Sequence, residues 1–262
     1  MVQIHSLKKD WSGLMVKSRG RKSIPQVLIG FGRHLVYAEG TKTEPLYVAD
    51  LRRLVATKLC VDERLIEIVT TTTSKTKHTK ELVDFAFHNV CERRKKGETI
   101  DYVWIFYDKD SFDDFDDAYL SIINLNNKHN KDDGTIPCDM FDTSWNACWS
   151  NECFEVWVYH YFENLNTPLP RDDYIKKINQ FLKRNGSKIE YSKSHEHLHT
   201  FLEANGGSLE LAIKLMKNKD VKGHVKPNPS SGVYLFAEYI LAYLSAKDNY
   251  YKSEKQDDTS GI

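Results

Sequence analysis

Hydrophobic positions in the first half of the chain form short apolar runs separated by longer amphipathic stretches. The runs predict strands at residues 34–38, 64–69, 102–107 and 138–142, the last one shorter and more edge-like. Helical spacing predicts helices between them at about 45–60, 79–96 and 112–130. Because the strands and helices alternate, we expect an α/β fold with an open, mostly parallel sheet and helices on both faces.

After residue 150 the spacing of apolar residues becomes mainly helical. The predicted helices cover about 152–162, 172–184, 194–204, 208–218 and 232–246. We therefore expect a basic arm at 1–30, an α/β domain at 31–150, a helical region at 151–250 and a polar tail at 251–262.

Composition is that of an ordinary globular protein, with 262 residues of which 40% are hydrophobic and 28% charged. The sequence has no apolar run near the 18 or so residues that cross a bilayer and no leader-like start, so we expect a cytoplasmic protein without membrane contact. Its five cysteines include no CxxC pair, which favours reduced, mostly buried thiols over a disulfide scaffold or a zinc ribbon.

The net charge of zero conceals two opposed blocks. Residues 1–36 hold seven basic residues and one acidic residue, a balance of +6, whereas residues 98–133 hold ten acidic and three basic residues, a balance of −7. The basic block could hold a phosphate backbone or a partner, so the zero total does not argue against a nucleic-acid substrate.

Carboxylates follow two of the predicted strands. Glu39 leaves the first strand, and Asp108 and Asp110 leave the third. Parallel strands end at one edge of a sheet, where α/β proteins bind ligands, and hard cations such as Mg²⁺ or Mn²⁺ prefer oxygen ligands. We expect a metal site of these three residues; the alternative is that Asp108 and Asp110 only cap the following helix.

Lysines lie at the same expected edge. Lys75 and Lys77 follow the second strand in a Thr- and Ser-rich loop, and Lys109 lies between the two aspartates. These three side chains are candidates for contacts with nucleic-acid phosphates, and they are equally consistent with solvated loops.

Three segments together are similar to one protein family. Glu39-Gly40 and Asp108-Lys109-Asp110 at strand ends resemble the TOPRIM domain of topoisomerases, primases and OLD-type nucleases. The segments VYAEGTKTEPLY (36–47), SNECFEVW (150–157) and NPSS (228–231) resemble the RloB family, which includes the AbiLii-type proteins. The similarity extends from about Arg21 to Leu244, and Glu152 departs from it where a proline is expected.

This resemblance implies a TOPRIM-like, metal-dependent nuclease that acts on RNA or DNA, tRNA included, as an effector of anti-phage defence. It also implies control by an AAA- or ABC-type ATPase; homodimerisation is left open. Glu39 would be the general acid/base or a metal-organising carboxylate, with Asp108 and Asp110 as Mg²⁺ ligands. Glu155 is a candidate additional acid, or else a charge at a helix start over an aromatic core; Glu44 is expected to be structural.

Two other functions stay open. The chain could be a non-catalytic nucleic-acid-binding or sensor subunit of an ATPase complex. More remotely, His195-Glu196-His197-Leu198-His199 matches the HExxH pattern of zinc metalloproteases, in which both histidines lie on one helix face. The sequence around His195 favours a polar helix start instead, and no third zinc ligand is evident.

Overall fold

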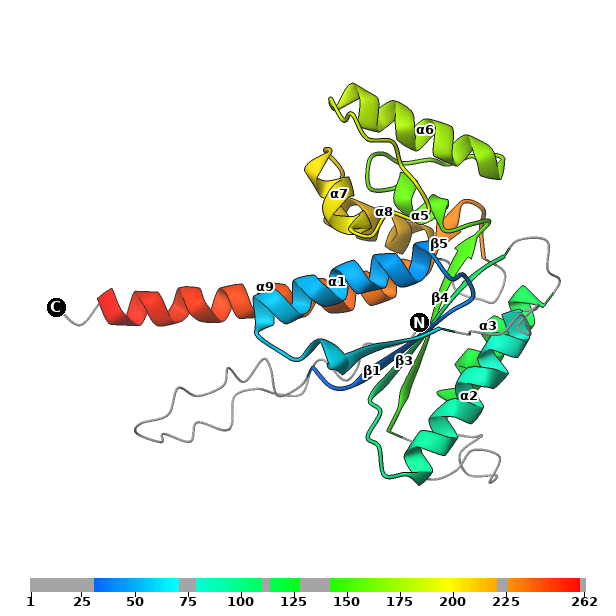
Figure 1. Cartoon of the computed structure of the whole chain (residues 1–262), viewed down its shortest axis with the longest axis vertical. Coiled ribbons are helices and arrows are strands. Elements are labelled where there is room, and N and C mark those ends of the chain that lie inside the picture. The colour runs from blue at the N-terminus through cyan, green and yellow to red at the C-terminus, as the bar shows by residue number, and fades with distance from the viewer. Residues whose placement is uncertain (1–30, 71–78, 110–113, 128–141, 221–225, 260–262) are drawn as a thin grey trace.

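A mostly parallel sheet forms the centre of the molecule. The computed structural model describes residues 31–70, 79–109, 114–127, 142–220 and 226–259, and its five strands have the order β2-β1-β3-β4-β5 (Figure 1). The parallel strands are β1 (His34–Ala38), β2 (Ile66–Thr70), β3 (Tyr102–Asp108) and β4 (Ser144–Asn151). The short β5 (Ser230–Ser231) pairs antiparallel with β4. The predicted α/β fold is confirmed.

One face of this sheet packs against α1 (Thr43–Leu59) and α9 (Val233–Thr259) (Figure 1). The strands contribute Val36, Ala38, Trp104, Phe106 and Cys148 to the core on this face. The same core continues into side chains that follow residue 150, such as Trp157 and Phe236. Residues before and after position 150 therefore share one hydrophobic core.

The other face packs against α2 (Thr79–Lys95) and α3 (Phe115–Leu125). Its core takes the alternate strand residues, among them Leu35, Tyr37, Val103, Ile105, Tyr107 and Trp149. Every residue of β1 is buried, which explains why its sequence is apolar almost throughout. The connections from β1 to β2 and from β2 to β3 run in opposite directions across the sheet. Right-handed connections therefore place α1 on one face and α2 on the other, as observed.

Four further helices gather beyond the end of the sheet toward which β4 points (Figure 1). They are α5 (Glu155–Tyr159), α6 (Arg171–Arg184), α7 (Leu198–Ala204) and α8 (Leu209–Lys219). α5 packs against α6, α7 against α1, and α8 against α9. A 3₁₀ turn, η2 (Glu63–Leu65), precedes β2. In the described parts of the chain, no helix combines the length and apolarity needed to cross a bilayer.

The predicted position of the fourth strand is wrong. Residues 138–141 lie outside the described residues and Asp142 is in a turn, whereas β4 begins at Ser144 and pairs with β3 along its length. The sequence of β4 contains polar residues and therefore does not resemble a buried strand. These polar side chains find hydrogen-bond partners inside the fold: the Asn146 amide donates to the Val103 carbonyl at 3.3 Å. The last helix also differs, since α9 runs to Thr259 and not to about 246.

Candidate functional site

Two acidic residues, Glu39 and Asp108, are neighbours where the strand order reverses. β1 lies between β2 and β3, so the chain crosses over β1 on its way from β2 to β3, and such switch points form ligand crevices in α/β sheets. Glu39 follows β1, and its backbone N–H donates to the Phe106 carbonyl at 3.0 Å. The backbone N–H of Asp108, the last residue of β3, donates to Glu39 Oε2 at 3.3 Å. Glu39 and Asp108 are thus neighbours at this edge of the sheet.

The donor set at this edge suits a hard cation. Two carboxylates on neighbouring strands provide oxygen ligands of the kind that Mg²⁺ and Mn²⁺ prefer. The third predicted ligand, Asp110, lies outside the described residues, as do Lys75 and Lys77. Among the described residues, no three His, Cys, Asp or Glu side chains are grouped closely enough to hold a metal ion. The three-carboxylate metal site therefore stays a prediction.

Arg171 is a member of this site that the sequence did not indicate. It is the first residue of α6, and its Nη2 lies 3.3 Å from Asp108 Oδ2. The Asp108 side chain is 15% exposed, whereas that of Arg171 is 39% exposed. The guanidinium thus offsets the charge of a largely buried carboxylate, which would otherwise repel Glu39.

Glu155 lies in a buried polar cluster next to these residues. Its side chain is 1% exposed, accepts a hydrogen bond from the Tyr191 hydroxyl at 2.9 Å and lies 3.3 Å from Lys193 Nζ. The neighbouring Cys153 thiol contacts both Glu155 and Arg171, and burial, with the charges of Glu155 and Asp108, raises its pKa to about 12. Glu155 is therefore the buried partner of a hydroxyl and a lysine, and not a solvated charge.

Glu44 contributes a further buried carboxylate. It lies in the first turn of α1, as expected, but is only 8% exposed. Burial, and next the negative charge of Glu155, raise the pKa of its carboxyl. A Cβ at Gly40 would overlap with Glu44 Oε2, so the glycine after Glu39 leaves the space that this carboxylate fills.

Lys109 and His195 are further predicted residues that the structure describes. The Lys109 ammonium lies 5.7 Å from the centre of the Phe115 ring, and its backbone N–H donates to the Ser150 carbonyl at 2.9 Å. His195 precedes α7, whose first residue is Leu198, and its ring stacks on Phe201.

The zinc-protease arrangement is therefore not formed. His199 is buried in α7 and pairs through Nδ1 with the Tyr161 hydroxyl at 3.2 Å. His195 and His199 do not share a helix face, which the HExxH arrangement requires.

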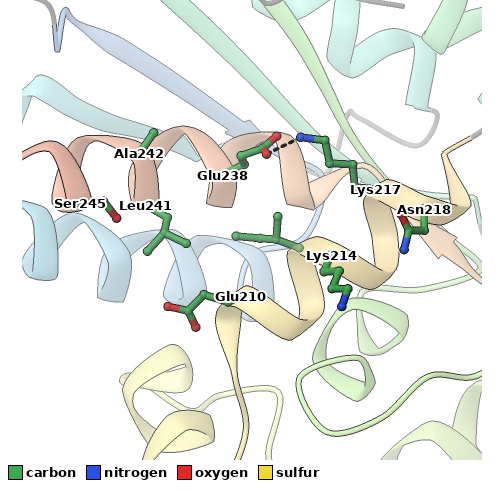
Figure 2. Close-up of a pocket in the computed structure, with 9 residues that line it drawn as sticks. Glu210, Lys214, Lys217, Asn218, Glu238, Leu241, Ala242 and Ser245 are labelled. Atoms are coloured by element: carbon green, nitrogen blue, oxygen red, sulfur yellow. Dashed lines mark hydrogen bonds and ion pairs between the residues drawn. The ribbon is translucent and has the colours of Figure 1, made fainter.

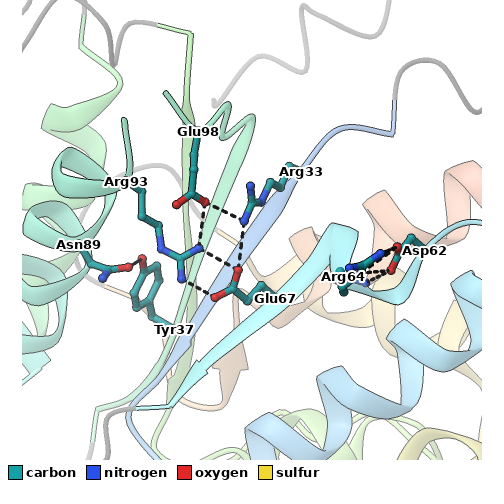
Figure 3. A network of polar contacts seen from close by, with 8 residues as sticks. All are labelled: Arg33, Tyr37, Asp62, Arg64, Glu67, Asn89, Arg93 and Glu98. Carbon is teal, nitrogen blue, oxygen red and sulfur yellow. Dashed lines mark hydrogen bonds and ion pairs between the residues drawn. The ribbon is translucent and has the colours of Figure 1, made fainter. Parts of the chain in front are cut away.

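A groove and an ion-pair network lie elsewhere in the molecule. A groove of about 440 Å³ runs between α8 and α9, with Lys217 and Glu238 among its lining residues (Figure 2). Arg33, Glu67, Arg93 and Glu98 form an ion-pair network that ties β2, the end of α2 and the segments before β1 and β3 (Figure 3). Arg33 and Glu98 precede their strands, so this network lies at the amino ends of the strands and has a structural role.

Comparisons with known proteins agree with the motifs. No curated protein and no solved structure shows a significant match to the chain. The family model described as RloB-like protein matches residues 34–240, which includes both carboxylates, Glu155 and the β5 segment. The chain therefore belongs to the RloB-like family.

Proposed function

We propose that the protein is a Mg²⁺- or Mn²⁺-dependent nuclease that hydrolyses phosphodiester bonds of RNA or DNA. The observation that carries this proposal is the pairing of Glu39 with Asp108 at the switch point of the sheet. Carboxylates at this edge can hold a hard cation against a phosphate. The family resemblance adds the expectation of a defence effector under the control of an ATPase, and leaves the choice between DNA, RNA and tRNA open.

The roles of the chain's own residues follow from their positions. Asp108, held in place by Arg171, and Glu39 would be the cation ligands from the described part of the site. When bound, the cation would supply charge stabilisation and a more acidic water for attack on phosphorus. Glu39, which follows β1 beside Asp108, would take the proton from the attacking water. Asp110 would complete the ligand set.

The test is cleavage of labelled tRNA, single-stranded RNA and duplex DNA by the purified full chain, with Mg²⁺, Mn²⁺ or EDTA. Cleavage should need the metal and should be lost in both Glu39→Gln and Asp108→Asn, because each removes an anionic ligand while keeping the side chain's shape. Glu63→Gln is the matched control, since Glu63 is a half-exposed carboxylate in η2. Metal-dependent cleavage that survives in Glu39→Gln would refute the proposed function.

A non-catalytic binding or sensor subunit is the second candidate function. The observation that favours it is the ion pair between Arg171 and Asp108, because a carboxylate with a cationic partner has less need of a metal. In that case the chain would bind nucleic acid or an ATPase but would not cleave, and Glu39→Gln would leave defence against phage intact in cells.

A further inference from the structure

The cations next to the candidate site come from the second half of the chain. Arg171 begins α6, and Lys193 lies in the segment between α6 and α7. Each is anchored to a carboxylate of the site: Arg171 to Asp108 and Lys193 to Glu155, both at 3.3 Å.

Exposure differs sharply within each ion pair. The Arg171 and Lys193 side chains are 39% and 47% exposed, whereas their partners Asp108 and Glu155 are 15% and 1% exposed. The positive member of each pair therefore faces solvent and the negative member lies behind it. A polyanion that approaches this part of the site meets the cations before the carboxylates.

The segment that carries Lys193 is fixed to the body of the protein at several points. The Lys193 carbonyl accepts a hydrogen bond from Thr43 Oγ1 at 3.3 Å, and the Tyr191 N–H donates to Asn179 Oδ1 at 2.7 Å. Tyr191 itself is 5% exposed and donates to Glu155. Because Thr43 begins α1, shortly after Glu39, these contacts set the position of Lys193 relative to the carboxylates.

We propose that Arg171 and Lys193 are the residues that bind the substrate's phosphates, so that the helical second half of the chain supplies the cationic side of the active site. This inference rests on the proposed function. A guanidinium binds phosphate oxygens through two parallel N–H donors, and an ammonium acts as a compact point charge. Both cations also offset the carboxylates of the site, which would otherwise repel a polyanion.

The test measures binding separately from cleavage. Full-length Arg171→Ala and Lys193→Ala proteins are titrated in Ca²⁺ buffer with two fluorescein-labelled probes, a 30-nucleotide single-stranded RNA and a 30-base-pair DNA, at several salt concentrations. For the probe that the wild type binds, each alanine variant should bind about tenfold more weakly, and the dependence of log Kd on log salt should fall by about one. Lys176→Ala is the control, because Lys176 is a 70% exposed cation of the same helix α6.

Conservative variants separate contact from folding, because removal of Lys193 takes a partner from the buried Glu155. Arg171→Lys and Lys193→Arg keep both charges and should restore the salt slope, with Arg171→Lys still weaker in affinity. Three results would overturn the inference. The alanine variants could keep the affinity and the salt slope of the wild type, or they could lose no more affinity than Lys176→Ala does. The wild type could also fail to bind either probe. If Glu39→Gln abolishes cleavage but the Arg171→Ala and Lys193→Ala proteins bind the probe as tightly as the wild type, this inference alone is overturned. If those two variants bind more weakly but the wild type cleaves nothing, only the nuclease function is overturned.

Discussion

His34 should make the stability of the protein depend on pH. Its side chain is fully buried at the start of β1. The Trp104 indole N–H donates to its Nδ1 at 3.0 Å, so the proton of the neutral ring lies on Nε2, which donates to the Phe31 carbonyl at 2.7 Å. Burial lowers the pKa of His34 from 6.5 to about 4, against the opposite effects of the Phe31 carbonyl and Asp101.

The sign and size of the effect follow from this shift. Below pH 6.5 the unfolded chain binds a proton on this ring and the folded protein does not, so stability falls as the pH falls. The loss amounts to about 2 kcal/mol at pH 5 and approaches about 3 kcal/mol at pH 4. It is absent above pH 7.5, where the ring is neutral in both states.

The substitution His34→Asn isolates this contribution. The amide oxygen of asparagine can accept from Trp104 in place of Nδ1, but it cannot bind a proton. Urea unfolding followed by tryptophan fluorescence should find the variant about 1–2 kcal/mol less stable than the wild type at pH 7.5, because the hydrogen bond to Phe31 is lost. At pH 5 the wild type should no longer have a higher free energy of unfolding than the variant. A free-energy difference that stays the same from pH 7.5 to pH 5 would refute the reasoning.

Four other changes test the surroundings of the site and the core. Gly40→Ala forces the Glu44 carboxylate to move and should lower metal-dependent cleavage roughly 100-fold with little change in circular dichroism; full activity would contradict this. Glu44→Gln should be more stable than the wild type at pH 7 and equally stable below about pH 4.5. The reason is that burial raises the pKa of Glu44, so its ionisation lowers the stability of the wild type as the pH rises. Urea unfolding at both pH values measures this difference, and an equal stability at pH 7 would contradict it. Glu155→Leu should lower the free energy of unfolding by about 1–3 kcal/mol, since the Tyr191 hydroxyl loses its acceptor, and Glu155→Gln should cost less in the same titration. Ile105→Ala, in the middle of β3, should cost about 2–5 kcal/mol in urea unfolding, because it leaves a cavity in a fully buried core.

The first half of the sheet and its two carboxylates could be predicted because they follow local rules. β1 and β3 are buried on both faces and hence apolar, and a carboxylate directly after such a strand must lie at the carboxyl edge. β4 could not be found in this way. Its Asn146 and Ser150 are satisfied by partners from other strands, Val103 and Ser231, and no local pattern reveals those partners.

The cationic members of the site were missed for a similar reason. Arg171 and Lys193 lie in polar stretches that resemble any exposed helix start or loop. Their importance arises only from contacts with Asp108, 63 positions earlier, and with the buried Glu155. The polar surroundings of Glu44, at a helix start, likewise resemble an ordinary first turn, and its burial depends on long-range packing.

The origin of these cations has a consequence for synthesis on the ribosome. Glu39 and Asp108 emerge early, but Arg171, Lys193 and the β5 pairing at Ser230–Ser231 come from the last hundred residues. A nascent or truncated chain that ends before residue 171 carries the acidic pair without either cation. The complete arrangement can therefore form only after residue 231 has been translated, so a shorter product would lack part of the candidate site.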